Sequence, residues 1–223
     1  MSGHVHGNGA QPQAQRPDVK SGKLVGTLAT FGAIAGLLIV VAFQWAQPRI
    51  LADKAAVLQA AIGEVLGAPD SIQSLFLING ALTETPTAGA DTTTMERVFV
   101  GYDAQGKRVG YAIIGEQPGF ADVILLIFGY DPATKQLLGM KVLDNKETPG
   151  LGDKIVKDTA FVGEFVGAAT PLRGVKSGAG KGEQNEIDMI TGVTISSRTI
   201  ISIINNKLAT MEPLLVQYAE KKP

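Results

Sequence analysis

Residues 97–142, RVFVGYDAQGKRVGYAIIGEQPGFADVILLIFGYDPATKQLLGMKV, decide the fold of this chain. The stretch contains one pattern twice: an apolar run, a turn with Asp103 or Asp131, and a second apolar run. Each copy predicts a β-hairpin, so together they predict a four-stranded, mainly antiparallel sheet. Val123–Phe128 is continuously apolar, which predicts a strand that is buried on both faces.

Helical patterns follow this stretch and complete a domain. Apolar residues at helical spacing predict one helix over Asp153–Val166 and a last helix over Ser197–Tyr218. The Gly- and Lys-rich segment 173–186 predicts a mobile loop, and the Thr-rich segment 80–94 predicts an exposed loop. The core face of the last helix is expected to consist of Ile200, Ile201, Ile203, Ile204, Leu208, Met211, Leu214 and Leu215. Residues 70–219 thus predict an α+β domain, with a single mainly antiparallel sheet covered by helices.

A membrane span is predicted near the N-terminus. Leu24–Trp45 contains no charged residue and, as a helix, would be about 33 Å long, enough for the core of a bilayer. Trp45 lies at one end, where interfacial aromatic residues anchor such helices. A cleaved signal peptide is the alternative, but its apolar region would be shorter and no A-x-A site follows directly after the span. We therefore expect a transmembrane helix over residues 24–45.

The flanks of this span predict its orientation. The basic residues Arg16, Lys20 and Lys23 precede it, so the N-terminus is expected in the cytoplasm and the domain on the periplasmic side of a bacterial inner membrane. Residues 49–66 predict an amphipathic helix that continues from the span, bends near Pro48 and docks on the domain. Its apolar stripe comprises Ile50, Val57, Leu58, Ala61, Ile62, Val65 and Leu66.

Composition excludes several classes of site. The chain has no cysteine, which rules out disulfides, iron–sulfur clusters and thiolate metal sites. Its two histidines, His4 and His6, lie in a Gly- and Gln-rich tail, residues 1–19, which predicts disorder and at most weak metal binding. A net charge of −1 gives no sign of nucleic-acid binding. A redox protein with this inventory would take its chemistry from an organic cofactor.

The segment 188–198, DMITGVTISSR, precedes the last helix and is rich in hydroxyls. Hydroxyl side chains cap the free N–H groups of a helix, whose N-terminus carries the positive end of the dipole. Such an N-terminus accepts phosphate, although many hydroxyl-rich caps only cap. The residues alone leave both interpretations open.

Asp188–Thr194 resembles the flavinylation motif of the FMN-binding domain family, Asp-x-x-(Ser/Thr)-Gly-Ala-Thr, with Val193 where the family usually has Ala. The resemblance implies that the phosphate of FMN is joined to Thr194 by a phosphoester, which would make the chain a phosphoprotein. A threonyl hydroxyl is a poor nucleophile and has no activating base nearby, so a separate flavin transferase that reads Asp188 is implied.

Further residues of this segment are expected at the cofactor. Thr191 and Gly192 belong to the same motif. Ile195 and Ser196 would offer free backbone N–H groups to the phosphate. Arg198 would add a charge-assisted contact or would be a solvated side chain, and the sequence leaves both open.

A second motif of the family lies upstream, at residues 147–154, ETPGLGDK. Gly150 and Gly152 permit positive φ and leave room for a flat ring to approach the backbone. Leu151 would offer an apolar face, whereas Glu147 and Thr148 would offer polar contacts. From the residues alone a tight turn is the alternative, and the resemblance implies that this loop lies against the isoalloxazine ring.

Both motifs occur in this order, behind one membrane helix, in the G subunit of the Rnf electron-transport complex and in the C subunit of the sodium-pumping NADH:quinone reductase. The resemblance covers about residues 24–219 and favours the first group, because the chain is short and the run 147–154 is uninterrupted. It implies a membrane-anchored FMN electron carrier in an ion-translocating oxidoreductase, rather than an enzyme by itself. The implied partners are other membrane subunits, a flavin transferase and the lipid bilayer.

Two rival classes remain. A free-standing, membrane-anchored flavin reductase would need a nicotinamide site, and no GxGxxG follows a predicted strand. A non-redox interaction module that has lost flavin is disfavoured by the intact Asp188, Gly192 and Thr194.

Overall fold

The computed structural model describes residues 21–86, 89, 92 and 95–221. They fall into two compact units, one ending at Ala52 and the other beginning at Asp53. The predicted tail, residues 1–19, and its two histidines lie outside the described residues, as do parts of the predicted loop 80–94.

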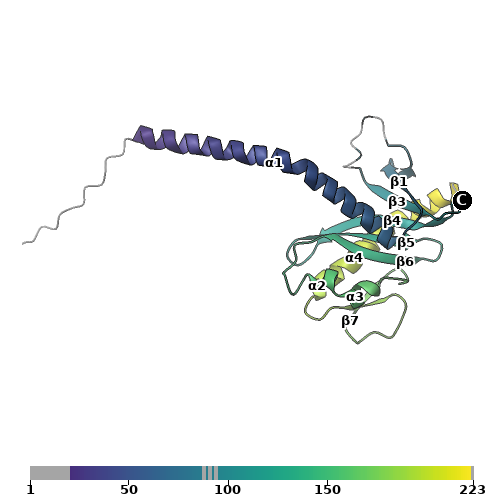
Figure 1. The fold of residues 1–223 in the computed structure, drawn as a ribbon. Helices are drawn as coiled ribbons and strands as arrows, with labels where there is room; N and C mark the ends of the chain where they lie inside the picture. The colour runs from purple at the N-terminus through teal and green to yellow at the C-terminus, as the bar shows by residue number, and fades with distance from the viewer. Residues whose placement is uncertain (1–20, 87–88, 90–91, 93–94, 222–223) are drawn as a thin grey trace, which may run out of the picture. The chain divides into compact units, whose positions relative to one another are not determined.

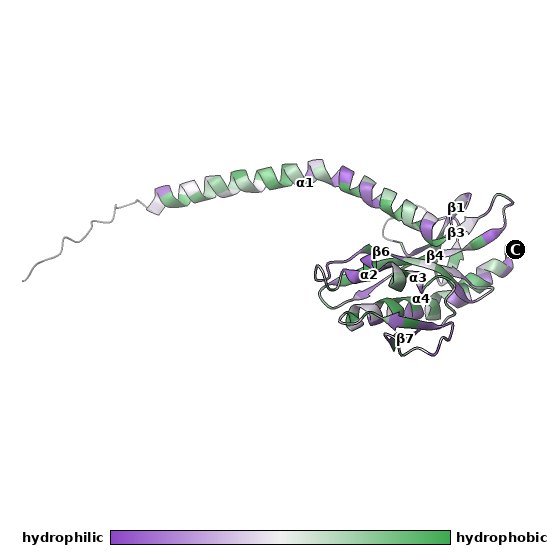
Figure 2. Ribbon diagram, turned by 60° about the horizontal axis from the view of Figure 1, so that its bottom comes forward, coloured by the Kyte–Doolittle hydropathy of each residue, from purple (hydrophilic) through white to green (hydrophobic). Residues whose placement is uncertain are grey.

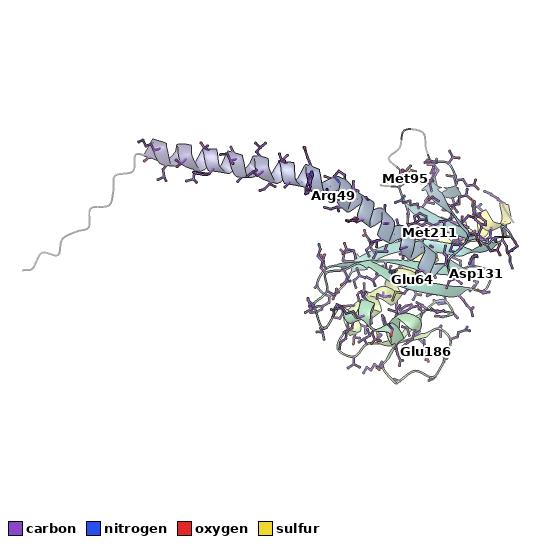
Figure 3. All side chains as sticks on the ribbon, viewed as in Figure 1. Arg49, Glu64, Met95, Asp131, Glu186 and Met211 are labelled. Carbon is purple, nitrogen blue, oxygen red and sulfur yellow. The ribbon has the colours of Figure 1, made fainter. Side chains whose placement is uncertain are left out.

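The first unit consists of the N-terminal part of α1 (Ser21–Val65). This helix is long and apolar enough to cross a membrane. Its large apolar side chains before Arg49 are exposed, and they project on all sides of the helix (Figure 3). Figure 2 shows this part as mainly hydrophobic, whereas hydrophilic residues appear further along. The Arg49 guanidinium lies over the ring of Trp45, 4.3 Å from its centroid.

The two expected helical segments, 24–45 and 49–66, run as one helix with Pro48 inside it. The bend expected at Pro48 stays a prediction. The apolar stripe expected over residues 50–66 is buried only in its second half. Ile50 and Val57 are exposed, and the buried part begins around Leu58.

The second unit is built on a six-stranded antiparallel sheet in the order β2-β1-β3-β4-β5-β6 (Figure 1). The strands are β1 (Ser71–Ile78), β2 (Ala81–Thr83), β3 (Arg97–Tyr102), β4 (Arg108–Pro118), β5 (Val123–Asp131) and β6 (Gln136–Asp144). The two predicted hairpins are β3–β4 and β5–β6, which confirms them. The sheet is larger than the four strands expected, because β1 and β2 add to the edge beside β3.

Both faces of this sheet are covered, as the alternation along its strands requires. In β5, Leu126 and Phe128 belong to the larger core with α4 (Thr194–Lys221), and Ile127 between them belongs to the smaller core with the end of α1. This confirms burial on both faces for the predicted strand except at its start, where Val123 is 43 % exposed. The helix α4 also has the expected core face, in which Leu214 is only partly buried.

The end of α1 reaches the sheet closely at a glycine. A Cβ placed on Gly129 would lie 2.1 Å from the carbonyl oxygen of Val65, which no side chain tolerates. Glycine at this position in β5 therefore lets the last turn of α1 pack against the strand.

The helix expected over Asp153–Val166 is wrong in one respect: it is two short helices. They are α2 (Lys154–Lys157) and α3 (Thr159–Gly163). Asp158 separates them in an extended conformation, and its carboxylate accepts hydrogen bonds from the N–H groups of Ala160 and Phe161. An N-cap inside the periodic run thus ends one helix and begins the next.

The segment 173–186 is not only a loop. It contains β7 (Arg173–Lys176) and the first residue of β8 (Glu186–Met189), which pair in parallel as a second, two-stranded sheet. The turn between them is held by Glu186, whose carboxylate accepts the N–H groups of Lys181 and Glu183.

Candidate functional site

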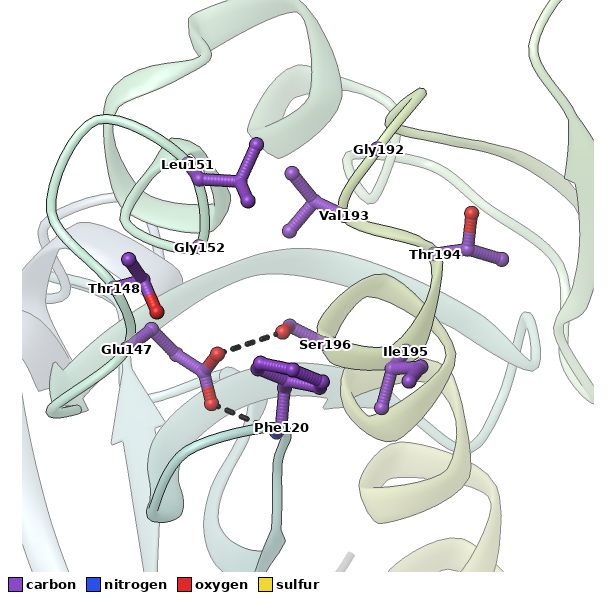
Figure 4. Close-up of a pocket in the computed structure, with 10 residues that line it drawn as sticks. All are labelled: Phe120, Glu147, Thr148, Leu151, Gly152, Gly192, Val193, Thr194, Ile195 and Ser196. Atoms are coloured by element: carbon purple, nitrogen blue, oxygen red, sulfur yellow. Dashed lines mark hydrogen bonds between the residues drawn. The ribbon is translucent and has the colours of Figure 1, made fainter.

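A cavity of about 290 Å³ lies where three segments meet: the β4–β5 turn, the loop after β6 and the N-terminus of α4 (Figure 4). These segments are far apart in the sequence, and the sheet and α4 bring them together. The lining residues are Phe120, Glu147, Thr148, Leu151, Gly152, Gly192, Val193, Thr194, Ile195 and Ser196. The walls are thus mostly apolar, with hydroxyls, a carboxylate and backbone groups at defined points.

The N-terminus of α4 forms one side of the cavity. The helix begins at Thr194, three residues before the predicted start, directly after a turn in which Gly192 has a φ of +82°. The N–H of Ser197 makes the first helical bond, to the carbonyl of Val193, at 3.0 Å. The N–H groups of residues 194–196 precede that bond and have no partner within the helix. They form the electropositive end of a 28-residue helix.

Hydroxyls inside this turn are mostly occupied. Ser197 Oγ donates to the Val193 carbonyl and accepts the N–H of Ile190. Ser196 is buried, and its Oγ donates to Glu147 at 2.9 Å. Thr194 is partly exposed, and its hydroxyl makes no hydrogen bond within the described part of the chain. In Figure 4 the Thr194 side chain lies at the outer edge of the cavity.

The loop after β6 forms the opposite side. Its turn is closed by the carbonyl of Thr148, which accepts the N–H groups of Leu151 and Gly152 at 3.2 and 2.8 Å. Gly150 has a φ of +78°, the conformation that favours glycine, as expected for this motif. Leu151 is 47 % exposed although it is a large apolar side chain, and it lines the cavity with Val193 (Figure 4).

Glu147 joins the segments. Its carboxylate accepts the N–H groups of Phe120 and Ala121 on one oxygen and the hydroxyl of Ser196 on the other. The side chain is only 5 % exposed. The polar contacts expected from it are therefore made to the protein, and its place at a cofactor stays a prediction.

Four of the predicted site residues lie outside the cavity lining: Gly150, Asp188, Thr191 and Arg198. Asp188 belongs to β8, where its carboxylate accepts the N–H of Gly178. Thr191 and Arg198 are exposed. Their contacts with a cofactor stay predictions.

Gly152 was expected to leave room for the ring and does line the cavity, although its φ is not positive. Two lining residues, Phe120 and Val193, were not predicted to bind the cofactor. Phe120 comes from the β4–β5 turn and is 66 % exposed. An aromatic residue in a hairpin turn was a signal in the sequence, but only the fold shows that this turn reaches α4.

A flavin mononucleotide needs a slot with apolar faces for its ring and an anion site for its phosphate. Phe120, Leu151 and Val193 supply apolar faces, and the free N–H groups at the start of α4 supply the donors. Thr194, the first residue of α4, lies at the outer edge of the cavity. The residues present therefore fit FMN.

Comparisons with known proteins agree with this fit. Residues 119–209 match the family model of the FMN-binding domain, and this range includes every residue that lines the cavity. The chain is 29 % identical to the G subunit of the ion-translocating oxidoreductase complex of Salmonella typhi, covering 86 % of this chain and 91 % of that protein. It is 28 % identical to the same subunit of Shewanella loihica, covering 87 % and 90 %. The corresponding protein of Methanosarcina acetivorans is 23 % identical, with coverage of 82 % and 90 %.

Two solved structures share the fold. NqrC of Shewanella oneidensis aligns with a TM-score of 0.63 and 19 % identity over 74 % of this chain and 99 % of that chain. The C subunit of the Na⁺-translocating NADH-quinone reductase of Parabacteroides distasonis aligns with a TM-score of 0.52 and 24 % identity, covering 66 % and 78 %. The motifs, the cavity and the model matched by residues 119–209 thus agree in their similarity to the FMN-binding domain.

Proposed function

We propose that this protein is the membrane-anchored FMN-carrying subunit of an ion-translocating oxidoreductase complex, corresponding to the G subunit of its relatives. The observation that carries the proposal is the cavity between the loop 147–152 and the N-terminus of α4, inside the matched FMN-binding domain. The long apolar part of α1 anchors this domain to a membrane. The relatives that match most of their length to this chain are subunits of such a complex by name.

The phosphate of FMN is proposed to be ester-linked to Oγ1 of Thr194. The free hydroxyl of Thr194, at the first residue of α4, supports this link. The N–H groups of Ile195 and Ser196 would then donate to the phosphate, whose negative charge the helix dipole favours. Within the described residues no side-chain base contacts Thr194 to activate it, so a flavin transferase is proposed to make the bond, reading Asp188 as part of its target.

The ring of FMN is proposed to lie between the apolar side chains of Leu151 and Phe120. When bound, FMN supplies the electron-transfer chemistry that this chain's own side chains lack. The task of the chain is to hold the ring, limit the access of water and leave one edge open to a redox partner. No acid or base is needed for the transfer of single electrons.

The domain is proposed to lie on the periplasmic side of a bacterial inner membrane, in contact with other membrane subunits. The basic residues Arg16, Lys20 and Lys23 before the span support this orientation. A covalent link would keep the mononucleotide from diffusing away on that side.

The alternatives are the C subunit of a sodium-pumping NADH:quinone reductase and a free-standing flavin reductase. The C subunit of the sodium-pumping NADH:quinone reductase shares the fold, as the structural alignments show. The relatives aligned over most of their length are G subunits of the ion-translocating complex, which favours the first proposal. A free-standing flavin reductase would oxidise NADH without any partner.

The test uses the full-length protein, produced together with a flavin transferase. After acid precipitation, the visible flavin absorbance should stay in the pellet of the wild-type protein and be lost in Thr194→Ala. The isolated protein should not oxidise NADH. Flavin that appears only in the supernatant would overturn the covalent link, and NADH oxidation by the protein alone would favour the reductase.

A further inference from the structure

Glu147 is the one charged residue that is buried in the described part of the chain. Within those residues no Lys or Arg forms an ion pair with it. A buried carboxylate without a cation is costly unless hydrogen bonds stabilise it. The carboxylate of Glu147 thus lies in the wall of the cavity without a cation, and it has to be stabilised by hydrogen bonds.

All contacts of this carboxylate come from donors. The N–H groups of Phe120 and Ala121 lie 2.9 and 3.2 Å from one oxygen, and the hydroxyl of Ser196 lies 2.9 Å from the other. An ionised carboxylate only accepts hydrogen bonds, whereas a protonated carboxyl would also need an acceptor for its own O–H. The three bonds also tie the β4–β5 turn to the first turn of α4. Figure 4 shows those to Phe120 and Ser196.

Two glycines leave room for this arrangement. A Cβ on Gly119 would lie 2.3 Å from one oxygen of Glu147, and a Cβ on Gly152 would lie 2.8 Å from the other. Both segments that enclose the carboxylate thus approach it more closely than any residue with a side chain could. This close fit holds the carboxylate of Glu147 at one position relative to the cavity.

We propose that Glu147 is a positioning residue that also sets the reduction potential of the flavin. Its fixed negative charge opposes the addition of electrons to a ring held in the same cavity. It therefore keeps the potential of the bound FMN lower than a neutral side chain of the same shape would. This inference rests on the proposed function, because it requires FMN in this cavity.

Glu147→Gln is the direct test, since it removes the charge and keeps the shape. The amide oxygen still accepts the N–H groups of Phe120 and Ala121, and the Ser196 hydroxyl can rotate to accept from the amide nitrogen. In the full-length, flavin-loaded protein we expect the midpoint potential to become more positive, corresponding to about a tenfold change in the reduction equilibrium, or about 59 mV for one electron. The matched control is Glu64→Gln, at an exposed carboxylate paired with Lys141 outside this cavity, which should not change the potential.

Ser196→Ala provides a second test with the opposite sign. It removes one donor but leaves the charge, which is then less stabilised by the protein, so the potential should become more negative. If Glu147→Gln fails to fold or to retain flavin, Ser196→Ala decides the matter alone. Flavin-loaded variants with the wild-type midpoint potential would overturn the proposal. Glu147 would then serve only to join the β4–β5 turn to the start of α4. Absence of flavin from the wild-type protein itself, measured by intact mass, would instead refute the proposed function.

Discussion

Leu151 shows how single residues prepare the cavity for a ring. The side chain is nearly half exposed, and it lines the cavity together with Val193. A large apolar side chain held at the mouth of a cavity gains free energy when a flat apolar group covers it. This residue is therefore expected to control the access of water to the flavin.

Leu151→Ala should change the bound flavin without preventing its attachment at Thr194. Water that reaches the ring stabilises the more charged reduced forms, so the midpoint potential should become more positive. The shift should be on the order of tens of millivolts, because about 1.4 kcal/mol corresponds to about 60 mV for one electron. Potentiometric titration followed by absorbance measures it. Val156→Ala, which trims an exposed apolar side chain outside this cavity, is the control and should leave the potential unchanged.

Glu164 predicts a pH dependence of stability. Its carboxylate accepts the N–H of Asp188 at 2.6 Å, and its pKa is raised above the ordinary 4.5, chiefly because of burial. A raised pKa in the folded state means that its contribution to stability is complete below pH 4.5 and is lost as the pH rises through the folded-state pKa. Glu164→Gln should therefore reduce the loss of stability of the full-length protein between about pH 4 and about pH 7. Denaturant titrations in detergent measure this, and equal pH slopes for the two proteins would contradict it.

Helices and strands that follow from a regular apolar spacing were predicted from the sequence. Those that begin or end because of a single residue were missed. The hairpins and the core face of α4 followed from alternation and from helical spacing. Asp158 divided one expected helix in two, because its carboxylate caps the second helix better than it continues the first. The pair β7–β8 was missed because a Gly-rich turn dominates the composition of residues 173–186.

The lining of the cavity was likewise predicted only in part from the sequence. Its two motif segments were identified in the sequence by resemblance, and the turn that carries Phe120 was not. Glu147 was expected to face a cofactor, but the structure gives its carboxylate three protein donors. Contacts of this kind join residues far apart in the chain, and no local pattern encodes them.

Gly129→Ala should disrupt the packing of the end of α1 on the sheet. The added Cβ would lie 2.1 Å from the carbonyl oxygen of Val65, a backbone atom that a side-chain rotation cannot move. We expect a loss of about 3 kcal/mol of stability, the upper range for overpacking. Denaturant unfolding of the full-length protein in detergent measures this.

Gly163→Ala is the matched control for that experiment. Apart from its chain neighbours and the backbone of its own helix, nothing lies within 4 Å of the added Cβ, and the residue is helical. Its stability should remain within about 1 kcal/mol of the wild-type value. A Gly129→Ala protein as stable as this control would show that the contact with Val65 is not needed.

At the scale of the whole molecule, the chain joins an apolar helix to a domain with its own core and its own cavity. The orientation in the membrane is predicted from the basic residues before the span. Alkaline phosphatase fused after residue 223 should therefore be active, whereas green fluorescent protein at the same place should be dark. The same reporters fused before residue 1 should give the reverse. Protection of the domain from protease in intact spheroplasts would contradict this topology.

Peptide mass spectrometry of the protein produced together with a flavin transferase tests the link at Thr194 most directly. Thr194 is partly exposed at the edge of the cavity with a free hydroxyl, whereas the hydroxyl of Ser196 is buried against Glu147. We expect the peptide containing residues 188–198 to gain one FMN, less one water, on Thr194. An unmodified Thr194, or FMN attached to Thr191 or Ser196 instead, would contradict it.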